Sequence, residues 1–274
     1  MELQWETKVL TAGVALAILW FAEACVPFYS QFEAGRKARL IHAAKNLGFG
    51  LFNAALLLAL FSSAFAAVTG RATDSGFGLL KRVDWPVWGE MFLVFVLFDL
   101  WMYLWHRANH RIGLLWRFHR MHHSDPEMDA STALRFHSGE VVLSAIARLA
   151  VLPLLGMTLA QLAFYEMVFL PVILFHHSNV RLPRWLDHGL LSVIVTPAMH
   201  RVHHSRWRPE TDSNYGSVFP YWDLIARSFR LRPDAHTIHL GLDGMDGPEW
   251  QSLPGMVRTP LTHVTQSGSP GQRE

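Results

Sequence analysis

The sequence has 274 residues, of which 51% are hydrophobic and only 17% are charged. Soluble domains usually carry about 25% charged residues, so this composition favours a membrane protein built as one structural unit. The formal net charge of +2 gives no support to nucleic-acid binding, and the single cysteine, Cys25, excludes a disulfide framework.

Three apolar segments in the N-terminal half predict membrane-spanning helices. They cover residues 9–28, 47–68 and 86–105, and about 20 helical residues cross the hydrocarbon core of a bilayer. The first segment is interrupted only by Glu23, and the preceding MELQWETK is acidic as well as basic. A secretory signal peptide would begin with basic residues, so an uncleaved first span is expected.

A fourth apolar segment, residues 141–175, contains Pro153, Gly156 and Pro171. It suits either a tight helical hairpin that re-enters the same membrane face or two short spans. We therefore expect an all-α, polytopic membrane protein with about four transmembrane helices and a cytoplasmic helical cap that carries the histidine cluster.

The distribution of basic residues predicts the orientation of these helices. Cytoplasmic connections carry an excess of Lys and Arg, and such residues are frequent in the first connection, after the third span and after residue 175. The opposite side has only Lys8, Arg71, Lys81 and Arg82. The N-terminus is therefore predicted outside, with residues 106–139 and everything after 176 in the cytoplasm.

The C-terminal residues differ in composition from the rest of the chain. Residues 233–250 have turn residues every few positions and predict a loop or a short extended segment. Residues 254–274 are rich in Pro, Gly, Ser and Thr without apolar periodicity, which is typical of a disordered polar tail. We therefore expect one membrane-embedded domain over residues 1–253.

Three short strings concentrate the histidines. Residues 106–110 read HRANH, residues 119–124 read HRMHHS and residues 200–205 read HRVHHS, while the flanks of the last two share little similarity, which argues against a duplication. Helix positions i, i+3 and i+4 lie on one face, so each HxxHH string directs three imidazoles the same way and HxxxH directs two. Because one metal ion takes about four to six ligands, these eight nitrogen donors predict two metal ions. Iron, zinc, copper and nickel all suit imidazole.

Two carboxylates and two arginines accompany these strings. An intramembrane carboxylate normally has a functional partner, and Asp99 is expected to accept a hydrogen bond from a metal-binding histidine on another helix, with an arginine pair or a protonated carboxyl as alternatives. Glu23 has a weaker connection with the site, and helix–helix hydrogen bonding explains it at least as well. Arg120 and Arg201 follow the first histidine of each HxxHH string; metal binding does not explain them, and pairing with a nearby carboxylate or a lipid phosphate is expected.

The motifs HRANH, FHRMHH and MHRVHHS, in this order on a membrane scaffold, resemble the sterol desaturase and fatty acid hydroxylase superfamily. DLWMYLWHR, TALRFHSGE, FHHSNVRLP and SNYGSVFPYWD are similar to further motifs of that family, so the motif core covers residues 90–225. Two features depart from the family pattern: Ser138 replaces the usual proline after His137, and Asp223 is followed by LIARSF instead of a Phe-Gly-Thr turn.

The resemblance implies an integral membrane oxygenase with a histidine-bound di-iron centre, in which zinc could replace iron in a purified sample. His137 matches a recurrent histidine of the family whose direct metal binding is less certain, whereas His176 and His188 have no assigned role. Asp99 is implied as a supporting residue behind the metal ligands. The metal ligands implied position by position are His106, His110, His119, His122, His123, His177, His200, His203 and His204.

The activity implied is an O2-dependent lipid hydroxylase or desaturase of the monooxygenase type, acting on a sterol-like, fatty acyl or related apolar substrate taken from the bilayer. The sequence has no fused haem, flavin or iron–sulfur motif, so the electrons are expected from a separate cytoplasmic donor. Two alternatives remain. One is a membrane zinc metallohydrolase, for which Glu140, after His137, is the candidate catalytic carboxylate; the other is a non-catalytic metal-binding membrane protein.

Overall fold

The computed structural model describes residues 2–30 and 35–262, with side chains from residue 6 onward. The described residues form an all-helical fold without a named strand, and two isolated β-bridges join Pro27 to Val180 and Ser205 to Leu240. Five of the described helices are long and apolar enough to cross a membrane. They are α1 (Glu2–Cys25), α2 (Arg36–Asp74), α3 (Val87–Arg111), α5 (Ser138–Leu155) and α6 (Leu159–His177).

Segment 141–175 forms two helices, so the candidate spans number five instead of about four. Helix α5 ends where Gly156 adopts a left-handed conformation with φ of 77°, which a glycine accepts without steric cost. Helix α6 begins three residues later, at Leu159, because the Thr158 side chain accepts a hydrogen bond from the Gln161 backbone N–H in a capping box. The intervening turn packs against the α2–α3 connection, where a Cβ atom on Gly78 would lie 2.4 Å from the Cα of Gly156.

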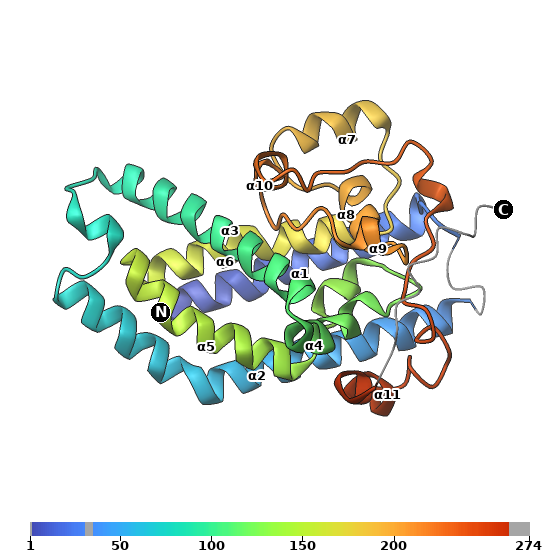
Figure 1. Ribbon diagram of the computed structural model, residues 1–274, viewed down its shortest axis with the longest axis horizontal. Helices are drawn as coiled ribbons and strands as arrows, with labels where there is room; N and C mark the ends of the chain where they lie inside the picture. Colours follow the sequence, from blue (N-terminus) through green and yellow to red (C-terminus); the bar gives the residue numbers. More distant parts are fainter. Residues whose placement is uncertain (1, 31–34, 263–274) are drawn as a thin grey trace.

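The five long helices run along the long axis of the molecule, and the shorter helices gather at one end of them (Figure 1). We call this end the cap end; the α2–α3 connection and the α5–α6 turn lie at the opposite end. The cap contains α4 (Gly113–His123), α7 (Arg184–Leu191), α8 (Pro197–His203), α9 (Arg208–Thr211), α10 (Tyr221–Ile225) and α11 (Leu253–Arg258), with the 3-10 turns η2 (Ala130–Leu134), η3 (Ala235–Thr237) and η4 (Thr259–Leu261). A further 3-10 turn, η1 (Leu79–Arg82), follows α2.

Large apolar side chains cover the outer faces of the long helices. Leu10, Phe21 and Leu51 are all more than 65% exposed, a surface that suits lipid and would be unfavourable in water. Inside the bundle, Phe98 of α3 packs with Leu152 of α5 and other buried residues in one apolar cluster. This cluster holds α3 against α5 and α6.

The segment predicted as a disordered tail is folded in its first part. Residues 253–261 form α11 and η4, and Met256 is completely buried. The physical reason is that the buried Arg120 guanidinium donates hydrogen bonds to the carbonyls of Thr259 and Thr262, contacts that composition does not reveal. The rest of that predicted tail, residues 263–274, lies outside the described residues.

Candidate metal centre

All three histidine strings lie at or near helix ends next to the cap. HRANH forms the last turn of α3, and Ile112, with an extended backbone, separates α3 from α4. Helix α4 ends with the first HxxHH string, while α8 carries the second, beginning with Pro197 in its first turn. Of the eight histidines in these strings together with His177, eight of the nine side chains are at most 6% exposed.

The histidines meet in two groups, each able to hold a metal ion, and within a group the candidate ligand atoms lie within 4.8 Å of one another. We call them the five-histidine group and the four-histidine group. The five-histidine group consists of His106, His110, His119, His123 and His203. The four-histidine group consists of His122, His177, His200 and His204.

The two HxxHH strings contribute to these groups in a reciprocal way. The first string gives its i and i+4 residues, His119 and His123, to the five-histidine group and its i+3 residue, His122, to the other. The second string gives its i and i+4 residues to the four-histidine group and its i+3 residue, His203, to the five-histidine group. With 3.6 residues per turn, position i+3 lies about 60° to one side of position i and i+4 lies about 40° to the other. One string can therefore serve two neighbouring metal sites.

The ring nitrogens approach one another as the ligands of a shared ion would. The Nε2 atoms of His177 and His122 are 3.0 Å apart, as are those of His200 and His177, and those of His123 and His119 are 3.2 Å apart. Metal–imidazole bonds of about 2.0–2.1 Å place neighbouring ligand nitrogens roughly 3.0–3.4 Å apart in octahedral or tetrahedral geometry. The donor set therefore fits two transition-metal ions.

Several rings are held by a hydrogen bond at Nδ1. His106 bonds the Tyr215 carbonyl at 2.9 Å, His177 the Ile173 carbonyl at 2.7 Å, and His203 the Ser213 carbonyl at 2.7 Å. A carbonyl only accepts, so Nδ1 carries the proton and Nε2 presents its lone pair to the group. The Nε2 atoms of His106 and His203 are buried without a hydrogen-bond partner among the described residues, as expected of nitrogens reserved for a metal.

Burial keeps five imidazoles of the HxxHH strings neutral. Burial, followed by the neighbouring imidazoles, lowers the pKa values of His122, His123, His200 and His204 well below the ordinary value. Burial also lowers the pKa of His203 to about 3. A metal binds the deprotonated nitrogen of neutral imidazole, so these residues are in the binding form at neutral pH.

Comparison with known proteins agrees with this geometry. The family model for fatty acid hydroxylases matches residues 91–228, which is 138 of the 274 residues. The chain belongs to the fatty acid hydroxylase family. The match includes HRANH, both HxxHH strings and His177, and hence all nine histidines of the two groups.

Three relatives illustrate the family. Ornithine lipid hydroxylase of Rhizobium tropici is 30% identical over 162 residues, which is 59% of this chain and 48% of the relative. Alkylglycerol monooxygenase of Caenorhabditis elegans is 34% identical over 151 residues, covering 50% of this chain and 26% of the relative. A cholesterol 25-hydroxylase-like protein of Danio rerio is 29% identical over 148 residues, covering 53% and 55%. The chain thus spans less than half the length of the first two. No solved structure matches it significantly.

A cavity of about 80 Å³ adjoins both histidine groups. Its wall includes His106 and His119 of one group and His122, His177 and His200 of the other. The remaining wall residues are Met102, Trp105, Asn109, Phe136, Glu140, Phe169, Ile173, His176, Gly216 and Ser217. The cavity therefore joins the candidate metal ligands to an apolar surface formed by α3 and α6.

Three other histidines singled out in the sequence lie outside both groups. The ring of His137 is engaged elsewhere, since its Nδ1 accepts from Gly139 N–H and its Nε2 lies 3.2 Å from the Val257 carbonyl. His176 lies beside the four-histidine group, with its ring centre 4.0 Å from that of His200. His188 is exposed on α7. His137 caps the start of α5, and metal binding by it stays a prediction.

Asp99 supports the site indirectly, which corrects the prediction that a histidine donates to it. Its fully buried carboxylate accepts hydrogen bonds from the Tyr165 hydroxyl, the Trp222 indole N–H and the backbone N–H groups of Val218 and Phe219. These bonds tie α3 and α6 to the loop that supplies the carbonyl bonded by His106. Asp99 is too far along α3 to contact His106, but both residues bond the same loop, which connects them indirectly.

Replacement of Asp99 by asparagine is expected to destabilise the protein by about 1–3 kcal/mol, because an amide N–H2 group would face donors that need an acceptor. The midpoint of thermal unfolding in detergent measures this effect. The matched control is Asp84→Asn on an exposed position, which should leave the midpoint unchanged. Equal midpoints for Asp99→Asn and wild type would contradict the anchoring role.

Glu140 is a supporting residue whose role the sequence reasoning missed. Its Oε1 atom lies 2.8 Å from His119 Nδ1, the arrangement in which a carboxylate orients a metal-binding imidazole. The same oxygen accepts a hydrogen bond from Asn109 Nδ2 at 3.2 Å. The signal available was the TALRFHSGE motif, in which Glu140 lies in the first turn of α5.

The arginines of the HxxHH strings bind backbone carbonyls, and the expected carboxylate or phosphate partners are not needed. Arg120 donates to Thr259 and Thr262, as described above. Arg201 donates to the carbonyls of Ser178 and Val180, and its guanidinium lies 3.8 Å from the ring centre of Phe28. Each arginine thus fixes a separate chain segment behind its histidine string.

Glu23 has the structural role favoured for it. Its Oε1 atom accepts from the backbone N–H groups of Ala130 and Asn179, and its Oε2 atom pairs with Arg39 at 2.7 Å. These contacts join α1 and α2 to the segments around η2 and after α6.

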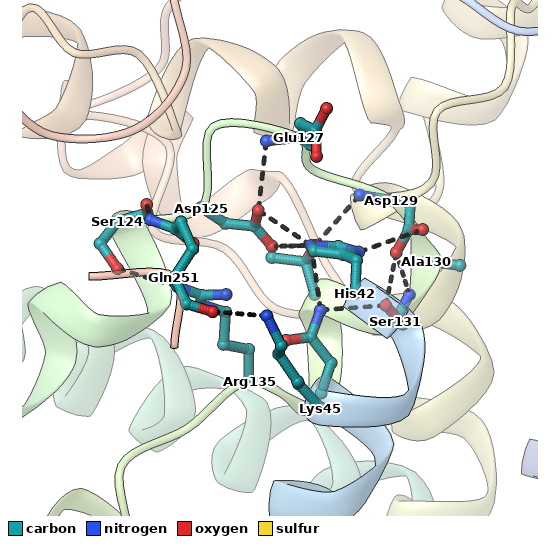
Figure 2. Close-up of polar contacts among 12 residues, drawn as sticks. His42, Lys45, Ser124, Asp125, Glu127, Asp129, Ala130, Ser131, Arg135 and Gln251 are labelled. Atoms are coloured by element: carbon teal, nitrogen blue, oxygen red, sulfur yellow. Dashed lines mark hydrogen bonds and ion pairs between the residues drawn. The ribbon is translucent and has the colours of Figure 1, made fainter. Parts of the chain in front are cut away.

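A buried polar network surrounds Ser124 and Asp125, at the end of the first HxxHH string (Figure 2). His42 of α2 is placed between two carboxylates, with its Nε2 2.9 Å from Asp125 and its Nδ1 3.6 Å from Asp129. Asp125 also accepts from the Thr132 hydroxyl and the Glu127 backbone N–H. Asp125 directly follows the HRMHHS string, so this network fixes the end of α4.

Arg135 connects this network to the end of the first HxxHH string and to Gln251. Its Nε donates to the Met121 carbonyl, while its Nη2 donates to the hydroxyl of Ser124 and to the side chain of Gln251. Gln251 in turn donates to the Ser124 carbonyl at 2.8 Å. The end of the string is therefore held in place by two contacts. His42 of α2 bonds Asp125, and Gln251 of the C-terminal segment bonds Ser124.

Proposed function

We propose that this protein is a membrane-bound di-iron oxygenase that uses O2 and two external electrons to hydroxylate or desaturate a C–H bond of a lipid. The observation that carries the proposal is the pair of buried, neutral histidine groups beside a partly apolar cavity. The relatives are named as a lipid hydroxylase, an alkylglycerol monooxygenase and a cholesterol 25-hydroxylase-like protein, which supports a lipid substrate.

The five-histidine group would hold one iron and the four-histidine group the other. Bound iron would supply the activation of O2 and the oxidising power for the C–H bond. Neutral ligands leave the ions most of their positive charge. Glu140 would orient His119, and backbone carbonyls would orient His106, His177 and His203. Zinc, which imidazole also suits, could occupy the same ligands after purification.

The apolar part of the cavity would hold the lipid. Met102 and Trp105 of α3 and Phe169 and Ile173 of α6 provide a wall for a hydrocarbon segment beside the candidate metal ligands. Exclusion of water from this wall would protect the reaction from side processes. Because α3 and α6 are candidate spans, a substrate could enter from the bilayer.

We further propose that all five long helices cross the bilayer and that the cap lies in the cytoplasm. The packing of the α5–α6 turn against the α2–α3 connection supports two full crossings by α5 and α6 over a hairpin that returns to the same face. The excess of basic residues on the cap side supports the orientation. A separate cytoplasmic protein would then deliver electrons to the cap end, and the membrane-embedded domain would extend to residue 262.

Comparative lipid mass spectrometry tests the reaction. Cells with the active protein should contain lipids whose mass differs from those of cells lacking it, by a gain of 16 for insertion of oxygen or a loss of 2 for desaturation. Cells that carry the His203→Ala variant provide the matched control. Identical lipids in all three would contradict the proposed function.

Metal analysis of the purified chain separates the proposal from the hydrolase alternative. About two irons per chain are expected, one for each histidine group. A single zinc per chain, with hydrolysis of a lipid ester and no consumption of O2, would favour the metallohydrolase instead. Metal binding without either reaction would favour a non-catalytic protein.

A further inference from the structure

The cavity wall contains polar side chains that metal binding does not explain. Asn109, Glu140 and His176 line the cavity but belong to neither histidine group. They are 2%, 6% and 2% exposed, so water outside the protein does not reach them freely. What they bind inside the cavity bears on the choice of substrate.

The orientation of the Asn109 amide follows from its neighbour. The Nδ2 atom of Asn109 donates to Glu140 Oε1, and a carboxylate oxygen can only accept. The Asn109 Oδ1 atom is therefore the free end of the amide. It has no hydrogen-bond partner among the described residues, and neither does Glu140 Oε2.

Two adjacent acceptors thus remain unpaired on the wall after the metal ligands are accounted for. A buried acceptor without a donor loses its hydration with nothing in exchange, so such atoms normally have a partner. His176 Nδ1 is also unpaired, but an imidazole can donate or accept and does not define the chemistry of a ligand. Asn109 Oδ1 does define it, because this amide oxygen needs a hydrogen-bond donor, and the neighbouring Glu140 Oε2 can accept from the same group.

The rest of the wall restricts where that donor can be. Met102 and Trp105 precede Asn109 on α3 and line the same cavity. Phe169 and Ile173 of α6 complete its apolar part. A hydrocarbon segment against this surface would place a neighbouring polar group at the two acceptors. The ligand that fits is therefore a lipid with a hydrogen-bond donor close to an alkyl or acyl chain.

We infer that Asn109 and Glu140 select, for oxidation, lipids that carry a free O–H or N–H group next to the hydrocarbon segment that reacts. This inference rests on the proposed function and adds the substrate class to it. Asn109 is then a specificity-determining residue that contacts the substrate. The donor adds a hydrogen bond to the bound lipid, whereas a lipid without one leaves two buried acceptors unpaired.

Two matched pairs of probe lipids test the selection with the iron-loaded protein in lipid nanodiscs. The first pair is hexadecanol and hexadecyl methyl ether; the second is N-hexadecanoylglycine methyl ester and its N-methyl counterpart. Within each pair only the donor differs. Phosphatidylcholine, which has no O–H or N–H donor, is the third probe, and mass spectrometry measures the rate of oxidation of each.

The wild-type protein is expected to oxidise the free member of at least one pair about tenfold faster than its methylated counterpart, a ratio equivalent to about 1.4 kcal/mol. Asn109→Leu should bring that ratio to about one, and Asn109→Ser, which keeps a smaller polar group, should give an intermediate ratio. Leu104→Ala, on the same helix but at an exposed position outside the cavity, should keep the wild-type ratio. Because each ratio is measured within one preparation, partial loss of iron does not affect it.

Three outcomes would overturn the inference. Equal rates within both pairs would show that the acceptors bind only water, as would oxidation of phosphatidylcholine at the rate of the free probes. A preserved ratio in Asn109→Leu would remove Asn109 from the selection. In these cases lipid oxidation still occurs and the proposed function stands, whereas no oxidation of any probe or native lipid by iron-loaded protein would overturn both.

Discussion

Replacement of His203 by alanine is expected to lower lipid oxidation by about 100-fold or more and to reduce bound iron from about two ions per chain to about one. Loss of residues that merely support a metal ligand already costs about 10- to 100-fold, and His203 belongs to the five-histidine group itself. Its Nδ1 donates to the Ser213 carbonyl, so its Nε2 faces the group. In the alanine variant no other nitrogen takes up this position. Iron per chain and the rate of O2 consumption measure the two effects.

The neighbouring His204 provides a parallel variant. It belongs to the four-histidine group, so His204→Ala should remove the other iron and also stop turnover, because the proposed reaction needs both ions. His188→Ala is the control, since His188 is exposed on α7 and lies outside both groups. Full iron content and wild-type O2 consumption in either His203→Ala or His204→Ala would contradict the assignment of two metal sites.

Replacement of Asp125 by asparagine is expected to lower the free energy of unfolding by about 3–5 kcal/mol, the usual cost of removing one partner from a buried ion pair. Asp125 is completely buried, and it accepts from His42, from Thr132 and from the Glu127 backbone (Figure 2). An asparagine would present its amide N–H2 to these donors and leave His42 without its closer carboxylate. Thermal unfolding in detergent measures the loss.

The surface pair of Asp234 and Arg232 offers a matched control. These side chains are 2.7 Å apart, but Asp234 is 53% exposed, and exposed pairs contribute only about 0–1 kcal/mol. Asp234→Asn should therefore shift the unfolding midpoint little. A shift for Asp125→Asn as small as that of Asp234→Asn would show that the network does not stabilise the fold.

The same carboxylate predicts how stability depends on pH. Burial acts to raise the pKa of Asp125, but His42 and Arg135 outweigh it and the pKa lies below the ordinary value. A depressed folded pKa contributes stability that is present above the unfolded value of about 3.9 and is lost as the pH falls through the folded value. Wild-type protein should thus lose part of its advantage over Asp125→Asn in acid, which unfolding midpoints from pH 7 to pH 3 would measure.

The sequence by itself determined the features that depend on neighbouring residues. Hydropathy over about 20 residues reports a span directly: segment 47–68 lies within α2, while segments 9–28 and 86–105 coincide with α1 and α3 except for residues 26–28 and 86. The shared helix face of positions i, i+3 and i+4 likewise predicted convergent imidazoles in each HxxHH string. Segment 141–175 was left open because a hairpin and two spans have the same composition.

Only the tertiary structure decided which residues meet across the chain. The partition of His119 and His123 from His122 depends on how α4 faces α8, an angle that neither string encodes. The partners of Asp99 lie more than sixty residues away along the chain, and the fold of residues 253–261 depends on the buried Arg120. A periodic pattern tells which side of a helix is apolar or polar, but hydrogen bonds and metal sites form between faces that packing brings together.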